Sequence, residues 1–174
     1  MRTLDLEELR RQLLEACLLK GDFTLRSGKK SQYYLDKFRF VLNPDILGSL
    51  AEAITAKLPA GTEILAGPEL GAVPLVTAVS LSTGLPGVIV RKEAKGYGTK
   101  NLIEGQLSEG AGVVLLEDVI TTGGQAIAAA DVLRSLGARV LKVISVVDRS
   151  KGEAAAAFSE AGFEYETLFG VDLD

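Results

Sequence analysis

The chain alternates short apolar runs with longer amphipathic stretches, which is the pattern of a β-sheet covered by helices. Apolar runs rich in β-branched residues predict strands over 63–66, 88–91, 112–116, 139–147 and near 163–169. Helical spacing of apolar residues predicts helices over 72–82, 125–136 and through the alanine run 154–157. This order predicts an α/β fold with a doubly wound parallel sheet.

The N-terminal part follows a different pattern. A leucine stripe after Asp5 and Glu8, which resemble a helix cap, predicts a helix over 6–19. Residues 23–36 indicate two short extended segments around a Ser-Gly turn, and Asn43-Pro44 begins a helix predicted over 44–58. We therefore expect the helix and hairpin within 1–42 to form a small hood beyond the carboxyl edge of the sheet.

Length and charge narrow the class of protein. With 174 residues, the chain is long enough for one domain with a proper core and short for two, so we expect a single domain over 1–174. The net charge is -4 and the cations are scattered except around 91–100, which argues against a nucleic-acid partner. No run approaches the ~20 apolar residues of a membrane span. The first ten residues show no secretory signal, so we expect a cytoplasmic protein without a membrane partner.

The absence of histidine limits the chemistry. It excludes Ser-His-Asp and Cys-His catalysis and most catalytic zinc sites. The single cysteine, Cys17, cannot form an internal disulfide and lies on the apolar face of the first predicted helix, where we expect it to pack in the core. Catalysis is left to carboxylates, lysines, hydroxyls, backbone dipoles or a loosely held metal.

The most informative stretch is 113–125, which passes from a buried apolar run to two acids and then to Thr-Thr-Gly-Gly. Ligands bind at the carboxyl edge of open α/β sheets, and N–H groups at a helix start can bind a phosphate that glycines let approach closely. Glu117 and Asp118 suit ribose hydroxyls or a magnesium ion held through water. The stretch lacks the Walker A and dinucleotide patterns. The alternative is an ordinary turn with solvated acids.

Two other segments indicate binding. Residues 91–105 place four cations and three glycines after a strand, which suits a basic lid over an anionic leaving group. The alternative is a solvated loop. In the segment 23–36, Tyr33 and Tyr34 suit stacking on a flat heterocycle, and Arg26 suits a carboxylate or phosphate. The alternative is a hairpin with ordinary surface aromatics.

Together with Val147-Asp148-Arg149, these three segments resemble the orotate phosphoribosyltransferases, of the type I phosphoribosyltransferase family. The resemblance covers nearly the whole chain. It implies transfer of ribose 5-phosphate from 5-phosphoribosyl 1-diphosphate (PRPP) to orotate, giving orotidine 5′-monophosphate and pyrophosphate in pyrimidine biosynthesis. It also implies a homodimer with the lid exchanged between subunits, and Mg²⁺ that is carried by PRPP or pyrophosphate with few or no direct protein ligands.

The same resemblance assigns residues to roles. Lys95, Glu117 and Asp118 are the expected catalytic residues, with Lys95 stabilising charge in the transition state. The expected PRPP-binding positions are Glu69, Leu70, Arg91, Lys92, Lys95, Tyr97, Glu117, Asp118, Val119, Ile120, Thr121, Thr122, Gly123, Gly124 and Gln125. The expected orotate-binding positions are Arg26, Tyr33, Tyr34, Thr121 and Arg149.

The chain departs from the family pattern at two of these positions. Tyr97 stands where many members have a histidine, which puts proton transfer by that position in doubt, although tyrosine still donates a hydrogen bond. Leu70 stands where many members have a lysine. The loop 67–71 is then left to bind pyrophosphate through backbone N–H groups, helped by an unusual peptide geometry.

Three alternatives remain at this stage. A purine or uracil salvage phosphoribosyltransferase shares the phosphosugar turn, but the hairpin segment and Arg149 argue against it. A non-catalytic regulator of the same fold that senses PRPP would normally add a nucleic-acid-binding module or a basic face, which this sequence lacks. A receiver-like domain with an acidic strand end leaves the basic glycine-rich segment unexplained.

Overall fold

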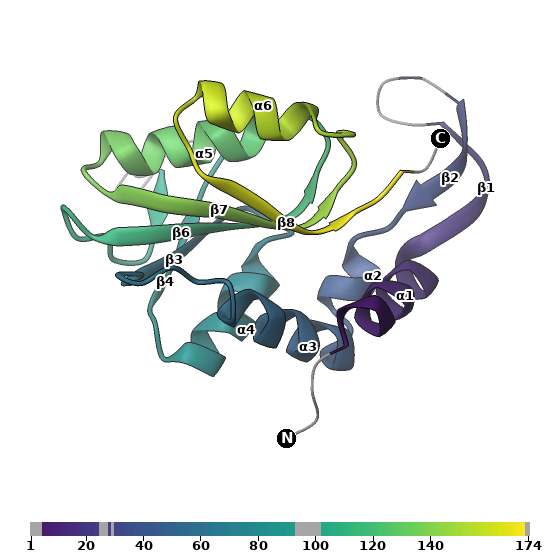
Figure 1. Cartoon of the computed structure of the whole chain (residues 1–174), viewed down its shortest axis with the longest axis horizontal. Coiled ribbons are helices and arrows are strands. Elements are labelled where there is room, and N and C mark those ends of the chain that lie inside the picture. Colours follow the sequence, from purple (N-terminus) through teal and green to yellow (C-terminus); the bar gives the residue numbers. More distant parts are fainter. Residues whose placement is uncertain (1–4, 25–27, 29, 93–101, 173–174) are drawn as a thin grey trace.

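The structure, a computed structural model, describes residues 5–24, 28, 30–92 and 102–172. Its main element is a six-stranded sheet in the order β5-β4-β3-β6-β7-β8, parallel except for β5 (Figure 1). The strands are β3 (Ile64–Pro68), β4 (Gly87–Val90), β5 (Ile103–Glu104), β6 (Gly112–Ile120), β7 (Arg139–Asp148) and β8 (Tyr165–Gly170). The predicted doubly wound α/β fold is confirmed, with one short antiparallel strand at the edge.

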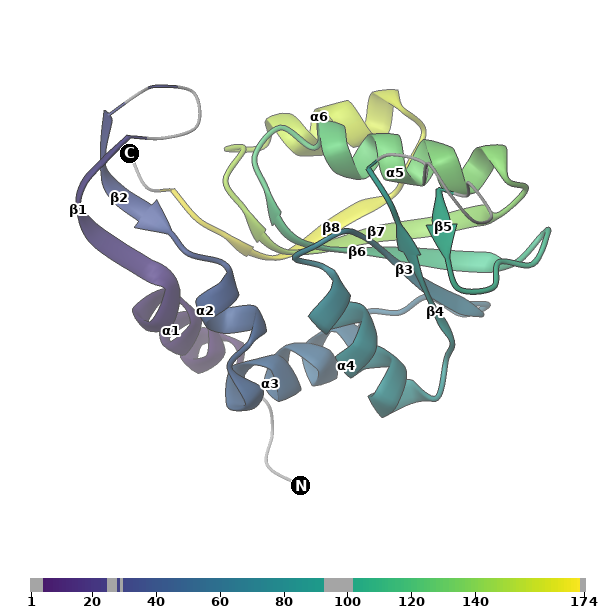
Figure 2. The same ribbon diagram turned by 180° about the vertical axis from the view of Figure 1, so that it is seen from behind.

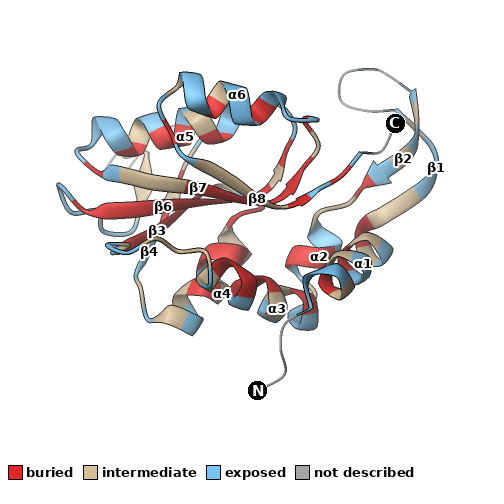
Figure 3. Ribbon diagram, viewed as in Figure 1, coloured by how far each residue is buried: buried red, intermediate tan, exposed pale blue. Residues whose placement is uncertain are grey.

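Helices cover both faces of this sheet. Helices α5 (Gly124–Ser135) and α6 (Glu153–Glu160) lie on one face, and α3 (Pro44–Thr55) and α4 (Val73–Thr83) lie on the other (Figures 1 and 2). Alternate residues of β6 serve the two cores: Val113 and Leu115 pack on the α5 side, and Val114 and Leu116 on the other. Because it is buried on both faces, β6 is an unbroken apolar run before its acids (Figure 3).

The N-terminal hood consists of α1 (Leu6–Cys17), α2 (Phe38–Val41) and an antiparallel pair, β1 (Leu18–Thr24) and β2 (Lys30–Leu35). The Asp5 side chain caps α1 by accepting the N–H groups of Glu7 and Glu8 at 3.0 and 3.1 Å. The β1–β2 pair stands beyond the carboxyl ends of the parallel strands, and the chain after β8 runs toward it (Figures 1 and 2). The hood therefore faces the edge at which ligands bind in this architecture.

Several predicted boundaries were wrong, each for a local reason. The helix over 6–19 ends at Cys17 because Leu18 and Leu19 pair with β2. The helix over 44–58 ends at Thr55, shortly before Pro59, which disfavours helical geometry in the residue that precedes it. The strand over 112–116 continues to Ile120 because β7 extends alongside it. The short elements α2 and β5 carry too few residues for a periodic pattern.

Two expectations about composition can be compared with the structure. Cys17 is completely buried among apolar residues, as expected of core packing, and this burial raises the pKa of its thiol to about 11. Among the described helices, none has the length and apolar character needed to cross a membrane.

Candidate functional site

The candidate site is a hollow of about 100 Å³ at the end of β6, where the chain turns into α5. It is lined by the continuous stretch 117–126 and by Lys37 of the hood. Gly123 has a φ of 84°, a left-handed conformation that suits glycine, and α5 begins directly after it. The first N–H groups of a helix have no partner inside the helix and attract anions. The turn therefore has the geometry of an anion-binding site.

Both acids of the motif are buried within β6 rather than exposed after it. Glu117 is 6 % exposed and Asp118 is 0 % exposed. Glu117 Oε1 accepts the Asp118 N–H at 3.1 Å, and Asp118 Oδ1 accepts the Val119 N–H at 2.6 Å. Burial, and then the adjacent charge of Asp118, raise the pKa of Glu117 well above its ordinary value, while Lys37 opposes the shift. The two neighbouring acids thus differ in environment.

Lys37, which the sequence analysis missed, supplies the cation at this site. It precedes α2, and its Nζ lies 2.7 Å from Asp118 Oδ2. The Lys37 side chain is 38 % exposed, so the ion pair joins a solvent-accessible cation to a fully buried carboxylate. No sequence signal distinguishes this lysine from the other cations of the hood, because its partner lies more than eighty residues away.

Gly71, also missed, makes room for that pair. A Cβ atom added at Gly71 would lie 1.5 Å from Asp118 Oδ2 and 2.8 Å from Lys37 Nζ. Neither approach is tolerable, so any side chain at this position must displace the carboxylate or the lysine. The sequence shows a glycine at this position of the loop, but it does not show that Gly71 packs against Asp118.

The loop 67–71 contains a cis peptide bond between Glu69 and Leu70, which the sequence does not reveal. The Glu69 side chain is directed to the start of the basic segment: its Oε1 accepts the Lys92 N–H at 2.8 Å, and its Oε2 lies 3.9 Å from Arg91 Nη1. Leu70 is 65 % exposed. Glu69 therefore fixes the base of the predicted lid, whereas Leu70 brings no charge and lines neither the hollow at the end of β6 nor the one beside α5.

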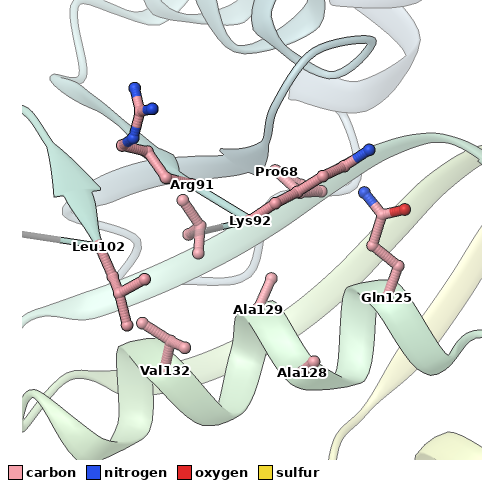
Figure 4. A pocket seen from close by; sticks show the side chains of 9 residues that line it. Pro68, Arg91, Lys92, Leu102, Gln125, Ala128, Ala129 and Val132 are labelled. Carbon is pink, nitrogen blue, oxygen red and sulfur yellow. The ribbon is translucent and has the colours of Figure 1, made fainter. Parts of the chain in front are cut away.

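A second hollow, of about 410 Å³, lies between the base of the predicted lid and α5. Figure 4 shows Lys92 extending toward Gln125, whereas Arg91 extends away from both. Arg91 Nη1 lies 3.4 Å from Glu104 Oε1. The side chains of Arg91 and Lys92 thus extend in different directions, and that of Lys92 extends toward the phosphate turn. Lys95 and Tyr97 lie outside the described residues.

The predicted base-binding residues are only partly brought together. Arg149 follows β7, and its N–H donates to the Ile120 carbonyl at 2.9 Å, which sets it beside Thr121. Its Nε is buried and has no hydrogen-bond partner among the described residues, so a donor is available for an acceptor on a ligand. Arg26 lies outside the described residues.

The two tyrosines are consecutive residues of β2, so their side chains project from opposite faces of the strand. Tyr33 lies on the more buried face, with Ser31 and Leu35. Tyr34 is 45 % exposed, and its ring lies 5.6 Å from that of Phe23. Tyr33 is therefore the better placed of the two to face the sheet edge.

Among the residues that the structure describes, no group of three or more acids or cysteines is arranged to hold a metal ion. The carboxylates at the hollow are Glu117 and Asp118, and one oxygen of Asp118 already pairs with Lys37. This donor set suits a divalent ion that brings most of its ligands with it, such as one bound to a diphosphate and water.

Comparison with known proteins agrees with this geometry. The family model for the phosphoribosyl transferase domain matches residues 43–165. Orotate phosphoribosyltransferase of Thermococcus gammatolerans is 45% identical over 164 residues, which are 92% of this chain and 86% of that protein. The crystal structure of Mycobacterium tuberculosis H37Rv orotate phosphoribosyltransferase in complex with Fe(III) dicitrate superposes with a TM-score of 0.84 at 32% identity, covering 95% of this chain and 96% of that one. A structure of the same enzyme in complex with PRPP gives a TM-score of 0.78 at 30% identity, over 95% of each chain.

Proposed function

The chain belongs to the phosphoribosyltransferase family and, within it, to the orotate phosphoribosyltransferases, and we infer that it transfers ribose 5-phosphate from PRPP to orotate. The products are orotidine 5′-monophosphate and pyrophosphate, and the reaction belongs to pyrimidine biosynthesis. The observation that carries this function is the buried pair Glu117 and Asp118 beside a glycine turn that opens α5, because a phosphosugar needs both an anion site and acceptors for its hydroxyls.

The reaction breaks the bond between ribose carbon 1 and the pyrophosphate oxygen and forms a bond from carbon 1 to a ring nitrogen of orotate, whose proton passes to solvent or to the departing pyrophosphate. Positive charge develops on the sugar ring during this exchange, as in glycoside hydrolysis. The 5′-phosphate suits the turn 121–125, and the ribose hydroxyls suit Glu117 and Asp118. An ionised Asp118 close to the ring would also stabilise its developing charge.

Orotate carries a carboxylate, which suits the unpartnered Nε of Arg149. Thr121 adjoins Arg149 through the Ile120 carbonyl, so a base held there lies next to the phosphosugar turn. Tyr33 offers an aromatic face for the flat ring, and Arg26 remains a sequence-based candidate for the same ligand. Uracil and purines lack this carboxylate, so they would leave the buried arginine donor unpaired.

The leaving pyrophosphate needs cations. Lys92 is directed toward the phosphate turn, and the loop 67–71 is the candidate for additional contacts through backbone N–H groups. Mg²⁺ bound with the diphosphate would supply further neutralisation of the leaving group. We propose that Lys95 and Tyr97 complete the site from a neighbouring subunit. A homodimer with exchanged lids and a cytoplasmic location are parts of this proposal.

A nucleobase panel tests the function. Purified protein with Mg²⁺ and PRPP should consume orotate, followed by its ultraviolet absorbance, while uracil, adenine and hypoxanthine react poorly. Turnover of a purine or uracil but not orotate would favour the salvage alternative. Binding of PRPP by calorimetry without turnover of any base would favour the non-catalytic sensor.

A further inference from the structure

A chain of buried hydrogen bonds lies directly beneath Arg149. Asp148, the last residue of β7, is 8 % exposed. Its Oδ1 accepts the Ser150 N–H at 2.7 Å, which closes a turn around Arg149, and its Oδ2 accepts the Tyr165 hydroxyl at 2.8 Å. The side chain of Asp148 therefore connects the turn that presents Arg149 to strand β8.

Tyr165 is held firmly enough to act as the anchor of this turn. Its ring stacks on Phe158 with the centroids 4.4 Å apart, and its oxygen lies 2.8 Å from Ser145 Oγ. Ser145 in turn donates to Thr167 Oγ1 at 2.9 Å. Burial, with a further contribution from Asp148, raises the pKa of Tyr165 above its ordinary value, so the hydroxyl keeps the proton that it donates.

The remaining contacts of the turn fix the backbone on both sides of Arg149. The Asp148 carbonyl accepts the Val171 N–H at 2.8 Å, and Ser150 Oγ accepts the Ala154 N–H at 3.0 Å at the start of α6. Among the buried side-chain donors of the described residues, Arg149 Nε is the one without a hydrogen-bond partner. The orientation of the Arg149 side chain thus depends on the conformation of the 148–150 turn, and the Asp148 side chain holds that conformation.

We propose that Tyr165 is a positioning residue for the base carboxylate: it anchors the Asp148 side chain, which holds the 148–150 turn and so directs the Arg149 guanidinium toward the ligand. This inference rests on the proposed function for the identity of the ligand, but the link from Tyr165 to Arg149 stands on the hydrogen bonds alone. Nothing in the sequence motif pointed to Tyr165, which lies sixteen residues after Arg149 on another strand.

Steady-state kinetics test the inference. Tyr165→Phe should raise KM for orotate about tenfold, the effect of one lost hydrogen bond. KM for PRPP and kcat should stay within about twofold, because the hydrogen bonds of Tyr165 go to Ser145 and Asp148 and not to the phosphosugar turn. The matched control is Thr167→Val, which removes a hydroxyl at the far end of the same chain of bonds and should leave all three parameters unchanged. Equal increases in both KM values, or none, would overturn the proposal.

A double-mutant cycle separates positioning from general destabilisation. Asp148→Ala should raise KM for orotate at least as much as Tyr165→Phe, and adding Tyr165→Phe to it should have no further effect, because both act through one bond. Asp148→Asn should remain near wild type, since the amide oxygen still accepts from Ser150 and the amide nitrogen can donate to Tyr165. Additive effects of Asp148→Ala and Tyr165→Phe would contradict a shared route.

A spectroscopic measurement distinguishes failure of this inference from failure of the proposed function. The Nε–H resonance of Arg149, assigned by its loss in Arg149→Lys, should shift and exchange faster with solvent in Tyr165→Phe but not in Thr167→Val. This readout needs no turnover. A wild-type protein inactive on orotate would overturn the proposed function, whereas an unchanged resonance in Tyr165→Phe would overturn the positioning role.

Discussion

Lys37 of the N-terminal hood pairs with Asp118 of the central strand, with Nζ and Oδ2 2.7 Å apart. The carboxylate is fully buried and the lysine is partly open to solvent. Removing one partner of such a pair leaves a buried charge without compensation, which costs more than the pair itself contributes. The pair therefore couples the stability of the hood to the state of the proposed PRPP site.

Lys37→Met should lower the free energy of unfolding by about 1–3 kcal/mol, discounted for the exposure of the lysine. It should also raise KM for PRPP, because Asp118 loses the contact that orients it. Urea unfolding and initial rates measure the two effects. Arg39→Met is the matched control, since Arg39 forms an exposed pair with Asp36 at 3.4 Å and should change stability by less than about 1 kcal/mol. Equal behaviour of the two variants would contradict a role for Lys37 in the site.

Gly71→Ala should reduce kcat/KM for PRPP by about 100-fold or more, because the added Cβ would overlap Asp118 Oδ2 and force the carboxylate out of place. Gly48→Ala is the control: this glycine lies within α3 with nothing within 4 Å of an added Cβ, so the variant should keep its activity. It should gain about 0.5–1 kcal/mol of stability, because alanine favours helix. Retained activity in Gly71→Ala would mean that Asp118 can move without loss.

Glu117 should make the protein less stable as the pH rises. Its pKa is raised by folding, so the native state binds more protons than the unfolded state above the ordinary value of 4.5, and stability is lost as the pH rises toward and through the folded pKa. The stability of Glu117→Gln relative to wild type should therefore increase with pH, by at most about 1.4 kcal/mol per pH unit. Urea unfolding between pH 5 and 8 measures this difference, and a constant difference would show that Glu117 does not titrate differently in the native state.

Lys95→Ala should lower kcat by orders of magnitude while leaving the melting temperature unchanged, because the resemblance assigns this lysine to transition-state stabilisation. Lys95→Ala and Asp118→Asn should each be nearly inactive alone. Mixed dimers of the two should regain activity if one subunit supplies the lid and the other the phosphosugar site. Verified mixed dimers without recovery would mean that each lid serves its own chain.

The sequence predicted the parts of the site that are contiguous in the chain. The motif 113–125 yielded the strand, the acids, the glycine turn and the helix start, because these follow one another with fixed geometry. The layers of the fold were predictable for the same reason, since the apolar periods of strands and helices differ.

Contacts between distant segments could not be predicted. Lys37 with Asp118, and Tyr165 with Asp148, join residues whose proximity depends on how the hood and the last strand pack. The burial of Glu117 and Asp118 was also missed, because it depends on how far β7 extends beside β6. Tyr33 and Tyr34 are adjacent in the sequence, which had suggested that they form one surface. Because side chains alternate along a strand, they lie on opposite faces of β2 instead.

The region shared across the wider family begins at residue 43 and ends at residue 165, yet Lys37 lies before it and most of β8 lies after it. A protein trimmed to that shared region would lack Lys37, the counter-ion of the Asp118 carboxylate. It would also end at Tyr165, the first residue of β8, and so lose the rest of that strand. A fragment that keeps both contacts must therefore include Lys37 and extend at least through Val171, whose N–H donates to the Asp148 carbonyl. A chain limited to the matched region would keep Glu117, Asp118 and Arg149 but lose the contacts that support them, and it would lack Tyr33 altogether.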